Sequence, residues 1–258
     1  MVRASVIGCG NMGSALVRGL SRTGKHEIIA YDVDPEALAA IEADCAETTE
    51  DIERATEPEI VFVAVKPGLV DDVVTDLDLS PSQTLVSIAA GVTTDFIAER
   101  TEATVVRLMP NLAAETGDMA AAVTGSQIPE AVEAMLGDVG EFVEVDESRM
   151  DVATAVNGSG PAFVFYLIGA MTDAGVEAGL EPDDAETLAA QTFKGAAETV
   201  LRSDRDVEEL IDAVCSPKGT TIEGMEVLWD SEADEAVAAA VAAAERRSAE
   251  LAAEFTDE

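Results

Sequence analysis

The sequence has little positive charge. Its 258 residues include 15 lysines and arginines against 52 aspartates and glutamates, which gives a formal net charge of −37. A protein that binds nucleic acid needs the opposite sign, because its affinity comes largely from neutralising phosphates. The excess of acids therefore argues against a nucleic-acid partner.

The acids are spread along the chain, and lysine is scarce. A surface of this kind repels itself in dilute buffer, and molar salt screens the repulsion over a few ångströms. We interpret the composition as that of a protein from a halophilic organism, which keeps molar salt in its cytoplasm. An ordinary acidic protein is the alternative.

Histidine and cysteine are also scarce. The only histidine, His26, lies where a predicted helix ends and a strand begins, so we expect its side chain to face solvent. One histidine excludes the common His-rich metal sites, and no nucleophile elbow accompanies it. The three cysteines, Cys9, Cys45 and Cys215, lack metal or redox spacing and are predicted to be reduced, mostly buried thiols. We therefore expect chemistry without a metal and without imidazole.

Long hydrophobic runs and a leader pattern are missing as well. The longest apolar run, PAFVFYLIGAM at 161–171, is shorter than the roughly 20 residues that a membrane span requires. The first residues lack a basic segment, an apolar segment and a cleavage site in series. The expectation is a soluble cytoplasmic protein without a membrane partner.

Strand and helix patterns alternate over the first half of the chain. Strands are predicted over 2–8, 27–32, 59–65, 84–90 and 104–109, with short ones at 119–124 and 141–145. Asp34 is expected to cap a helix that begins at Pro35. Such alternation predicts an α/β domain with a doubly wound parallel sheet.

From about residue 151 the strand patterns stop. Ala-rich amphipathic helices are predicted over 161–178, 183–202, 206–214, 220–229 and 232–253. We therefore expect an α/β domain over 1–152 and an all-α domain over 153–258.

A glycine-rich loop, GCGNMG, joins the first strand to the first helix. Gly8 would allow the tight turn, Gly10 the approach of a pyrophosphate, and Gly13 the close packing of helix on strand. Free N–H groups at the helix start would face the phosphates. The loop predicts a Rossmann-type dinucleotide site, with a merely structural glycine turn as the alternative.

Asp32 ends the second strand, where its carboxylate would accept hydrogen bonds from a ribose 2′-hydroxyl and repel a 2′-phosphate. This favours NADH over NADPH, although an acid at this position is also expected by chance in so acidic a chain. AVKPG (64–68) and SIAAG (87–91) end strands at the carboxyl edge, where open sheets bind ligands. Ala89 and Ala90 would let a nicotinamide lie flat, while Lys66 is equally a solvated loop lysine.

The residues expected to bind the coenzyme are Ile7, Gly8, Cys9, Gly10, Asn11, Met12, Gly13, Asp32, Ala64, Val65, Lys66, Pro67, Ala89, Ala90 and Asn111.

The stretch CSPKGTT (215–221) places one of only four lysines, Lys218, in a turn before a helix. Backbone N–H groups and the helix dipole make such a turn a site for an anion. The sequence up to this point leaves the anion unidentified.

Six motifs together resemble one enzyme family. GCGNMG, AVKP, SIAAGVT, MPN, NGSGPAFVF and SPKGTTIEGMEVL occur in the order and spacing of pyrroline-5-carboxylate reductases, over essentially the whole chain. The resemblance implies NAD(P)H-dependent reduction of 1-pyrroline-5-carboxylate to L-proline, the last step of proline biosynthesis. It also implies helical domains that interlock as a dimer, often in rings of five dimers, and an active site between one subunit's Rossmann domain and its partner's helices.

Position by position, the resemblance marks Ser216, Gly219, Thr220 and Thr221 as the substrate turn. Backbone N–H groups and Ser216 would hold the substrate carboxylate, and Thr221 would be the catalytic residue, bonded to the ring nitrogen. A capped helix start is the structural alternative.

Three positions depart from the family pattern. Lys218 replaces a glycine, and Asn157 and Phe163 stand where serine and tyrosine are usual. If Lys218 needs a positive φ, the turn is strained and activity is in doubt.

Two other functions stay open. One is another two-domain Rossmann reductase acting on a small carboxylate such as a hydroxy acid, which would need a catalytic lysine or histidine in the helical domain. Lys194 is the one candidate outside the substrate turn. The other is a dinucleotide-binding protein that lost turnover through Lys218.

Overall fold

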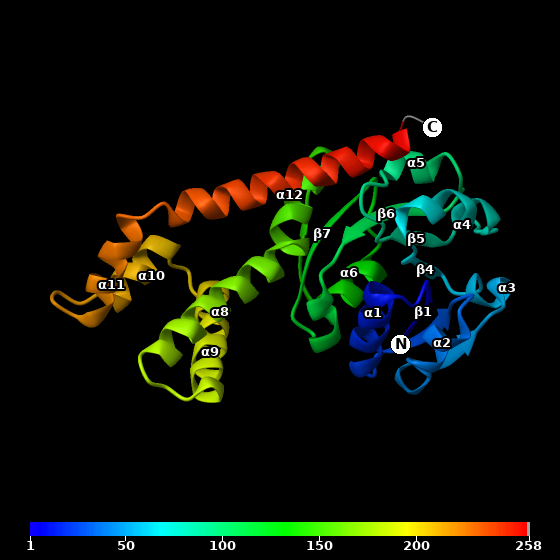
Figure 1. Cartoon of the computed structure of the whole chain (residues 1–258). Coiled ribbons are helices and arrows are strands. Elements are labelled where there is room, and N and C mark those ends of the chain that lie inside the picture. Colours follow the sequence, from blue (N-terminus) through cyan, green and yellow to red (C-terminus); the bar gives the residue numbers. More distant parts are fainter. Residues whose placement is uncertain (257–258) are drawn as a thin grey trace. The chain divides into compact units, whose positions relative to one another are not determined.

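The structure is a computed structural model, and it describes residues 1–256. The chain forms two compact units (Figure 1). Unit 1 contains Met1–Ser159 and the residues from Ala242 on, and unit 2 contains Gly160–Val241. The division therefore falls later than the expected 152/153, and the end of the last helix belongs with the α/β part of the chain.

Unit 1 is built on a sheet whose order, within the described residues, is β3-β2-β1-β4-β5-β6-β7-β8. The strands are β1 (Val2–Ile7), β2 (His26–Tyr31), β3 (Glu47–Thr49), β4 (Ile60–Val63), β5 (Thr84–Ser87), β6 (Thr104–Met109), β7 (Met119–Gly125) and β8 (Gly140–Glu144). The predicted parallel, doubly wound sheet is confirmed, with β6–β7 as an antiparallel pair in the described part. Sequence patterns missed β3, because its three residues contain no apolar run.

Helices cover both faces of this sheet. They are α1 (Asn11–Arg22), α2 (Pro35–Ala39), η1 (Glu42–Asp44), α3 (Ile52–Ala55), η2 (Pro67–Leu69), α4 (Val70–Asp76), α5 (Thr94–Ala98), η3 (Leu112–Thr116), α6 (Glu130–Gly137), η4 (Glu147–Arg149), α7 (Met150–Ala153) and the π-helical η5 (Thr154–Gly158). Asp34 caps α2 by accepting a hydrogen bond from the N–H of Glu36 at 2.9 Å, as predicted.

The core of unit 1 lies on the two sides of the sheet. Phe62 packs with residues of α1 and α6 on one side, and its neighbour Val61 packs with residues of α4 and α5 on the other. Side chains alternate along a strand, so covering both faces buries nearly every residue of the central strands. Each large buried side chain contributes about 1.5–3 kcal/mol.

Unit 2 is helical, as predicted. It holds α8 (Gly160–Glu177), α9 (Pro182–Arg202), α10 (Val207–Val214), α11 (Thr220–Trp229) and the first part of α12 (Ala233–Thr256). Ala185 and Ala189 of α9 are buried, whereas α8, α10 and α11 have no buried residue within the described chain. Tyr166 is 77% exposed and Trp229 56%. Exposed apolar surface of this extent is typical of a face that contacts a partner or a membrane.

Residues 147–177 form a helical stretch that is long and apolar enough to cross a membrane, and 6% of its apolar 18-residue window is buried. The sequence prediction considered only the shorter apolar run and missed this stretch. One stretch of this kind is weak evidence for a membrane, because an apolar helix at a subunit interface has the same length and composition.

His26 does not face solvent. Its side chain is 3% exposed, and its Nε2 lies 3.0 Å from Oδ2 of Asp138. The expectation was wrong because Asp138, the C-cap of α6, is brought over the start of β2 by packing across 112 positions of sequence. Hydrogen bonds from Lys25 and then His26 hold the pKa of Asp138 below its usual value.

Candidate functional site

The glycine loop after β1 has the geometry that its sequence predicts. Gly8 has φ +97°, and a Cβ there would lie 2.9 Å from the backbone of Ala64. A Cβ on Gly13 would lie 1.9 Å from the carbonyl oxygen of Gly8. A side chain on Gly8 would therefore collide with the segment after β4, and one on Gly13 would separate α1 from the glycine loop.

The start of α1 is open. Gly10 is the N-cap residue and supplies no side-chain cap, and a Cβ built on it would meet nothing within 4 Å. The first N–H groups of a helix have no partner inside it, and they carry the positive end of the dipole. The loop therefore fits the pyrophosphate of a dinucleotide.

Asp32 is tied to this loop. Its Oδ2 accepts a hydrogen bond from the N–H of Cys9 at 2.6 Å, and its Oδ1 accepts one from the N–H of Asp34 at 2.9 Å. Each carboxylate oxygen can accept a further bond. The carboxylate is thus held at the end of β2 with acceptor sites left for a ribose hydroxyl.

Cys9 is not a nucleophile in this loop. Burial, with smaller effects from Asp32 and Cys45, raises the pKa of its thiol to about 12. Only the thiolate reacts, so the side chain is inert at neutral pH. The three cysteines are free thiols, as predicted, but only Cys9 is fully buried, whereas Cys45 and Cys215 are half-buried.

The turns after β4 and β5 carry the other predicted coenzyme residues. Lys66 is exposed at the start of η2, and Ala89 is buried with Ala90 half-buried after β5. Gly91, with φ +79°, ends this second turn, where a Cβ would lie 3.0 Å from the backbone nitrogen of Ala252. The end of α12 therefore backs the turn after β5.

Asn111 uses its side chain inside the protein. Its Oδ1 accepts hydrogen bonds from the N–H groups of Ala113 and Ala120, each at 3.2 Å. Its Nδ2 donates to the carbonyl of Asn157 at 3.2 Å. The expected contact with coenzyme or substrate remains a prediction, and the bonds that the structure shows hold η5 against β7.

The side chain of Asn157, in η5, also donates hydrogen bonds to the sheet. Its Nδ2 donates to the carbonyls of Met109 at 2.6 Å and Ala120 at 2.9 Å. A serine hydroxyl has one donor and an asparagine amide has two. The departure from the family pattern thus gives η5 a second hydrogen bond to the sheet.

Arg107 lies within the strand predicted over 104–109, and the sequence by itself assigned it no role. It lies in β6, is 2% exposed, and its guanidinium pairs with Glu147. Glu147 also accepts a hydrogen bond from the hydroxyl of Thr94 at 2.9 Å. The available signal was the charge in the middle of the apolar strand TVVRLM, since a buried arginine requires a partner.

The predicted substrate turn lies in unit 2. The N–H of Gly219 donates to the carbonyl of Ser216 at 2.9 Å, and α11 begins at Thr220 without a side-chain cap. A Cβ on Gly219 would lie 2.4 Å from Oγ of Ser216, so the glycine leaves room for that hydroxyl beside the helix start. Ser216, Thr220 and Thr221 are exposed in this chain. The geometry fits a carboxylate held by N–H groups and a hydroxyl.

Lys218 adopts the conformation that normally favours glycine. Its φ is +63°, the one positive value at a non-glycine among the described residues. Left-handed backbone costs an ordinary residue about 1–2 kcal/mol. The turn is therefore strained at Lys218, as the glycine-to-lysine departure suggested.

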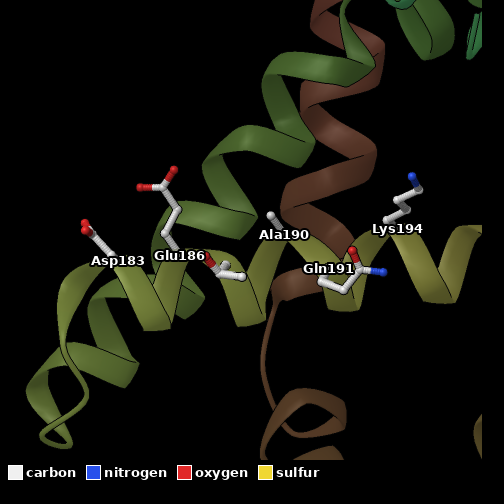
Figure 2. Close-up of a pocket in the computed structure, with 6 residues that line it drawn as sticks. Asp183, Glu186, Ala190, Gln191 and Lys194 are labelled. Atoms are coloured by element: carbon white, nitrogen blue, oxygen red, sulfur yellow. The ribbon is translucent and has the colours of Figure 1, made fainter. Parts of the chain in front are cut away.

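Lys194, the lysine named for the alternative reductase, lies on α9. A hollow of about 550 Å³ runs along one face of α9 and is lined by Asp183, Glu186, Thr187, Ala190, Gln191 and Lys194. Figure 2 shows these residues spread along one helix, with Lys194 and Asp183 at opposite ends. Within residues 1–256, no group of three or more His, Cys, Asp or Glu side chains is arranged to hold a metal.

Two family models match the chain. Residues 147–251 match "Pyrroline-5-carboxylate reductase dimerisation", and residues 3–91 match "NADP oxidoreductase coenzyme F420-dependent". The first covers η4, α7, η5 and the helices of unit 2. The second covers the glycine loop, Asp32 and the turns after β4 and β5.

Similar proteins agree over nearly the full length. The pyrroline-5-carboxylate reductase of Methanosarcina acetivorans is 38% identical, with 95% of this chain and 96% of that protein covered. The Escherichia coli enzyme is 36% identical over 86% of this chain and 88% of its own length. Among solved structures, the Coxiella burnetii enzyme has a TM-score of 0.87 at 30% identity, covering 96% and 97% of the two chains. The Plasmodium falciparum pyrroline carboxylate reductase with NADP bound has a TM-score of 0.83 at 28% identity, covering 97% and 98%.

Proposed function

Because this chain belongs to the pyrroline-5-carboxylate reductase family, we propose that it reduces 1-pyrroline-5-carboxylate to L-proline with a reduced nicotinamide coenzyme. The observation that carries the proposal is the similarity over the full length of the chain. The uncapped start of α11 at Thr220, within SPKGTT, agrees with it. This reaction is the last step of proline biosynthesis.

Unit 1 supplies the coenzyme site. The N–H groups at the start of α1 hold the pyrophosphate, and Asp32 accepts hydrogen bonds from the adenosine ribose. When bound, the reduced nicotinamide supplies a hydride to the imine carbon. The carboxylate of Asp32 repels a 2′-phosphate, so we propose that NADH is the better reductant.

Unit 2 supplies the substrate site. The first N–H groups of α11 and the Ser216 hydroxyl hold the substrate carboxylate beside the positive end of the helix dipole. The hydroxyl oxygen of Thr221 accepts a hydrogen bond from the N–H of the protonated ring. The ring nitrogen keeps that proton while the adjacent carbon gains hydride, which gives the amine of proline. The protein contributes orientation, and no imidazole is required.

The test is imine-dependent oxidation of NADH and NADPH at molar salt. Thr221→Val keeps the shape of the side chain and removes its hydroxyl. A lost hydrogen bond to a charged group costs about 1.5–3 kcal/mol, so kcat/KM should fall roughly 10- to 150-fold. Thr75→Val, on an exposed residue of α4, is the control. Unchanged kinetics in Thr221→Val would show that this threonine only starts a helix, and no imine-dependent oxidation in the wild type would refute the proposed activity.

The protein acts as a homo-oligomer. The match to the dimerisation model and the exposed apolar residues of unit 2 both support a dimer. We further propose that the dimers assemble into a ring of five, as the family resemblance implies, in the cytoplasm and without a membrane or nucleic-acid partner. Light scattering at molar salt measures the mass and separates a dimer from a decamer.

The acidic surface supports a halophilic origin. With a net charge of −37, the fold should be most stable at molar salt, because the Debye length falls to about 3 Å at 1 M. Thermal melts over a salt series test this. A Tm that stays constant between about 0.1 M and about 3 M salt would exclude it.

A further inference from the structure

Arg107 carries a buried charge that depends on one partner. The residue is 2% exposed, and among the described residues its NH1 pairs with Glu147, while its Nε and NH2 are buried without a hydrogen-bond partner. A buried charge that loses its counter-ion is strongly destabilising. The position of Glu147 is therefore fixed by the sheet beneath it.

Glu147 also binds a residue of a second element, α5. While Oε1 pairs with Arg107, Oε2 accepts a hydrogen bond from Oγ1 of Thr94 at 2.9 Å. Thr94 is the first residue of α5 and lies three residues after Gly91, which ends the turn that carries Ala89 and Ala90. One carboxylate thus joins β6 to the start of α5, just after that turn.

The end of α12 also contacts the turn after β5, at Gly91. Gly91 lies against the backbone of Ala252, as described above. Ser248, on the same part of α12, is 7% exposed and donates through Oγ to Oδ1 of Asp151 at 2.7 Å. Asp151 lies in α7, one helical turn after Glu147. The segment η4–α7 is therefore bonded both to the start of α5 and to the helix that backs Gly91.

We propose that Glu147 is a positioning residue for the coenzyme. By accepting the Thr94 hydroxyl while neutralising Arg107, it holds the turn after β5 in the shape on which the nicotinamide packs. Glu147 itself does not touch the coenzyme. This inference rests on the proposed function, since it assumes that Ala89 and Ala90 form the nicotinamide surface.

Three variants separate positioning from stability. Thr94→Val deletes the hydroxyl and leaves the ion pair intact. Glu147→Gln leaves the Arg107 charge without its counter-ion. The double variant Arg107→Met/Glu147→Met removes both the buried charge of Arg107 and that of Glu147, whose side chain is 33% exposed. Replacing a buried pair by apolar side chains of similar size is often neutral for stability. In the double variant Thr94 has no oxygen acceptor at position 147, whereas the amide oxygen of Glu147→Gln can still accept. Glu144→Gln, an exposed acid of β8, is the control.

The readout is the Kd of NADH, measured by fluorescence titration without substrate, beside the Tm. We expect Thr94→Val, Glu147→Gln and the double variant each to weaken NADH binding about tenfold, which corresponds to about 1.4 kcal/mol. The Tm should fall in Glu147→Gln and recover in the double variant, while the KM of the imine stays within about threefold of the wild type.

A purely structural role gives another result. NADH affinity would then recover together with the Tm in the double variant, and Thr94→Val would bind NADH like the wild type; this outcome overturns the proposal. A wild type that binds NADH but leaves the imine unreduced would refute the proposed function, and the same titrations would still decide the role of Glu147.

Discussion

Replacing Lys218 by glycine should stabilise the protein. At φ +63°, the lysine occupies a left-handed conformation that costs an ordinary residue about 1–2 kcal/mol. Glycine avoids that cost but loses more backbone entropy on folding, by roughly 0.5–1 kcal/mol. The net gain is therefore between about 0 and 1.5 kcal/mol, with a midpoint of about 0.75 kcal/mol. For a chain of this size, the midpoint raises the Tm by about 1.5–3 °C.

The same change should leave the substrate turn working. The bond from the Gly219 N–H to the Ser216 carbonyl does not involve the Lys218 side chain, which is exposed. An exposed ammonium is strongly hydrated, and molar salt screens a partly exposed ion pair to little value. The KM of the imine should change less than about threefold, which is under about 0.7 kcal/mol.

Thermal melts and initial rates at molar and lower salt test both parts. Lys194→Gly is the matched control, because the same exchange inside α9 should destabilise by about 1 kcal/mol. A Tm that falls in Lys218→Gly would refute the strain argument. A KM that rises about tenfold or more, most at low salt, would show that Lys218 binds the substrate carboxylate.

Three further predictions concern unit 1. Asp32→Ser should improve NADPH relative to NADH in steady-state kinetics; a wild type that already prefers NADPH about tenfold, or about 1.4 kcal/mol, contradicts the role given to this acid. Asp138→Asn should lower the Tm at neutral pH. The pKa of Asp138 is lower in the folded protein than in the unfolded chain, so its ionised carboxylate stabilises the fold at every pH above the unfolded-state pKa. The difference from wild type should shrink as the pH falls below about 4, and a constant difference would exclude this cause. Cys9, whose pKa is raised to about 12, should resist alkylation at about pH 8 until the protein is unfolded; labelling in the native state, read by mass spectrometry, would contradict its burial.

The sequence alone determined those features that depend on neighbouring residues. The glycine loop, the Asp34 cap and the open start of α11 are each encoded within about six consecutive residues, because turns and helix ends are local hydrogen-bond problems. Helix and strand periods likewise placed the longer strands of unit 1 and the helices of unit 2 close to their observed bounds. The motifs of the family resemblance are local in the same way, so the sequence alone is enough to predict the activity.

Only the tertiary structure decided which distant side chains meet. His26 meets Asp138 across 112 positions, Arg107 meets Glu147 across 40, and Asn111 meets Asn157 across 46. No local pattern specifies these partners, because a buried charge or amide requires some partner without indicating where in the chain it lies. The same holds for the end of α12, whose helical period is visible in the sequence but whose return to the turn at Gly91 depends on packing.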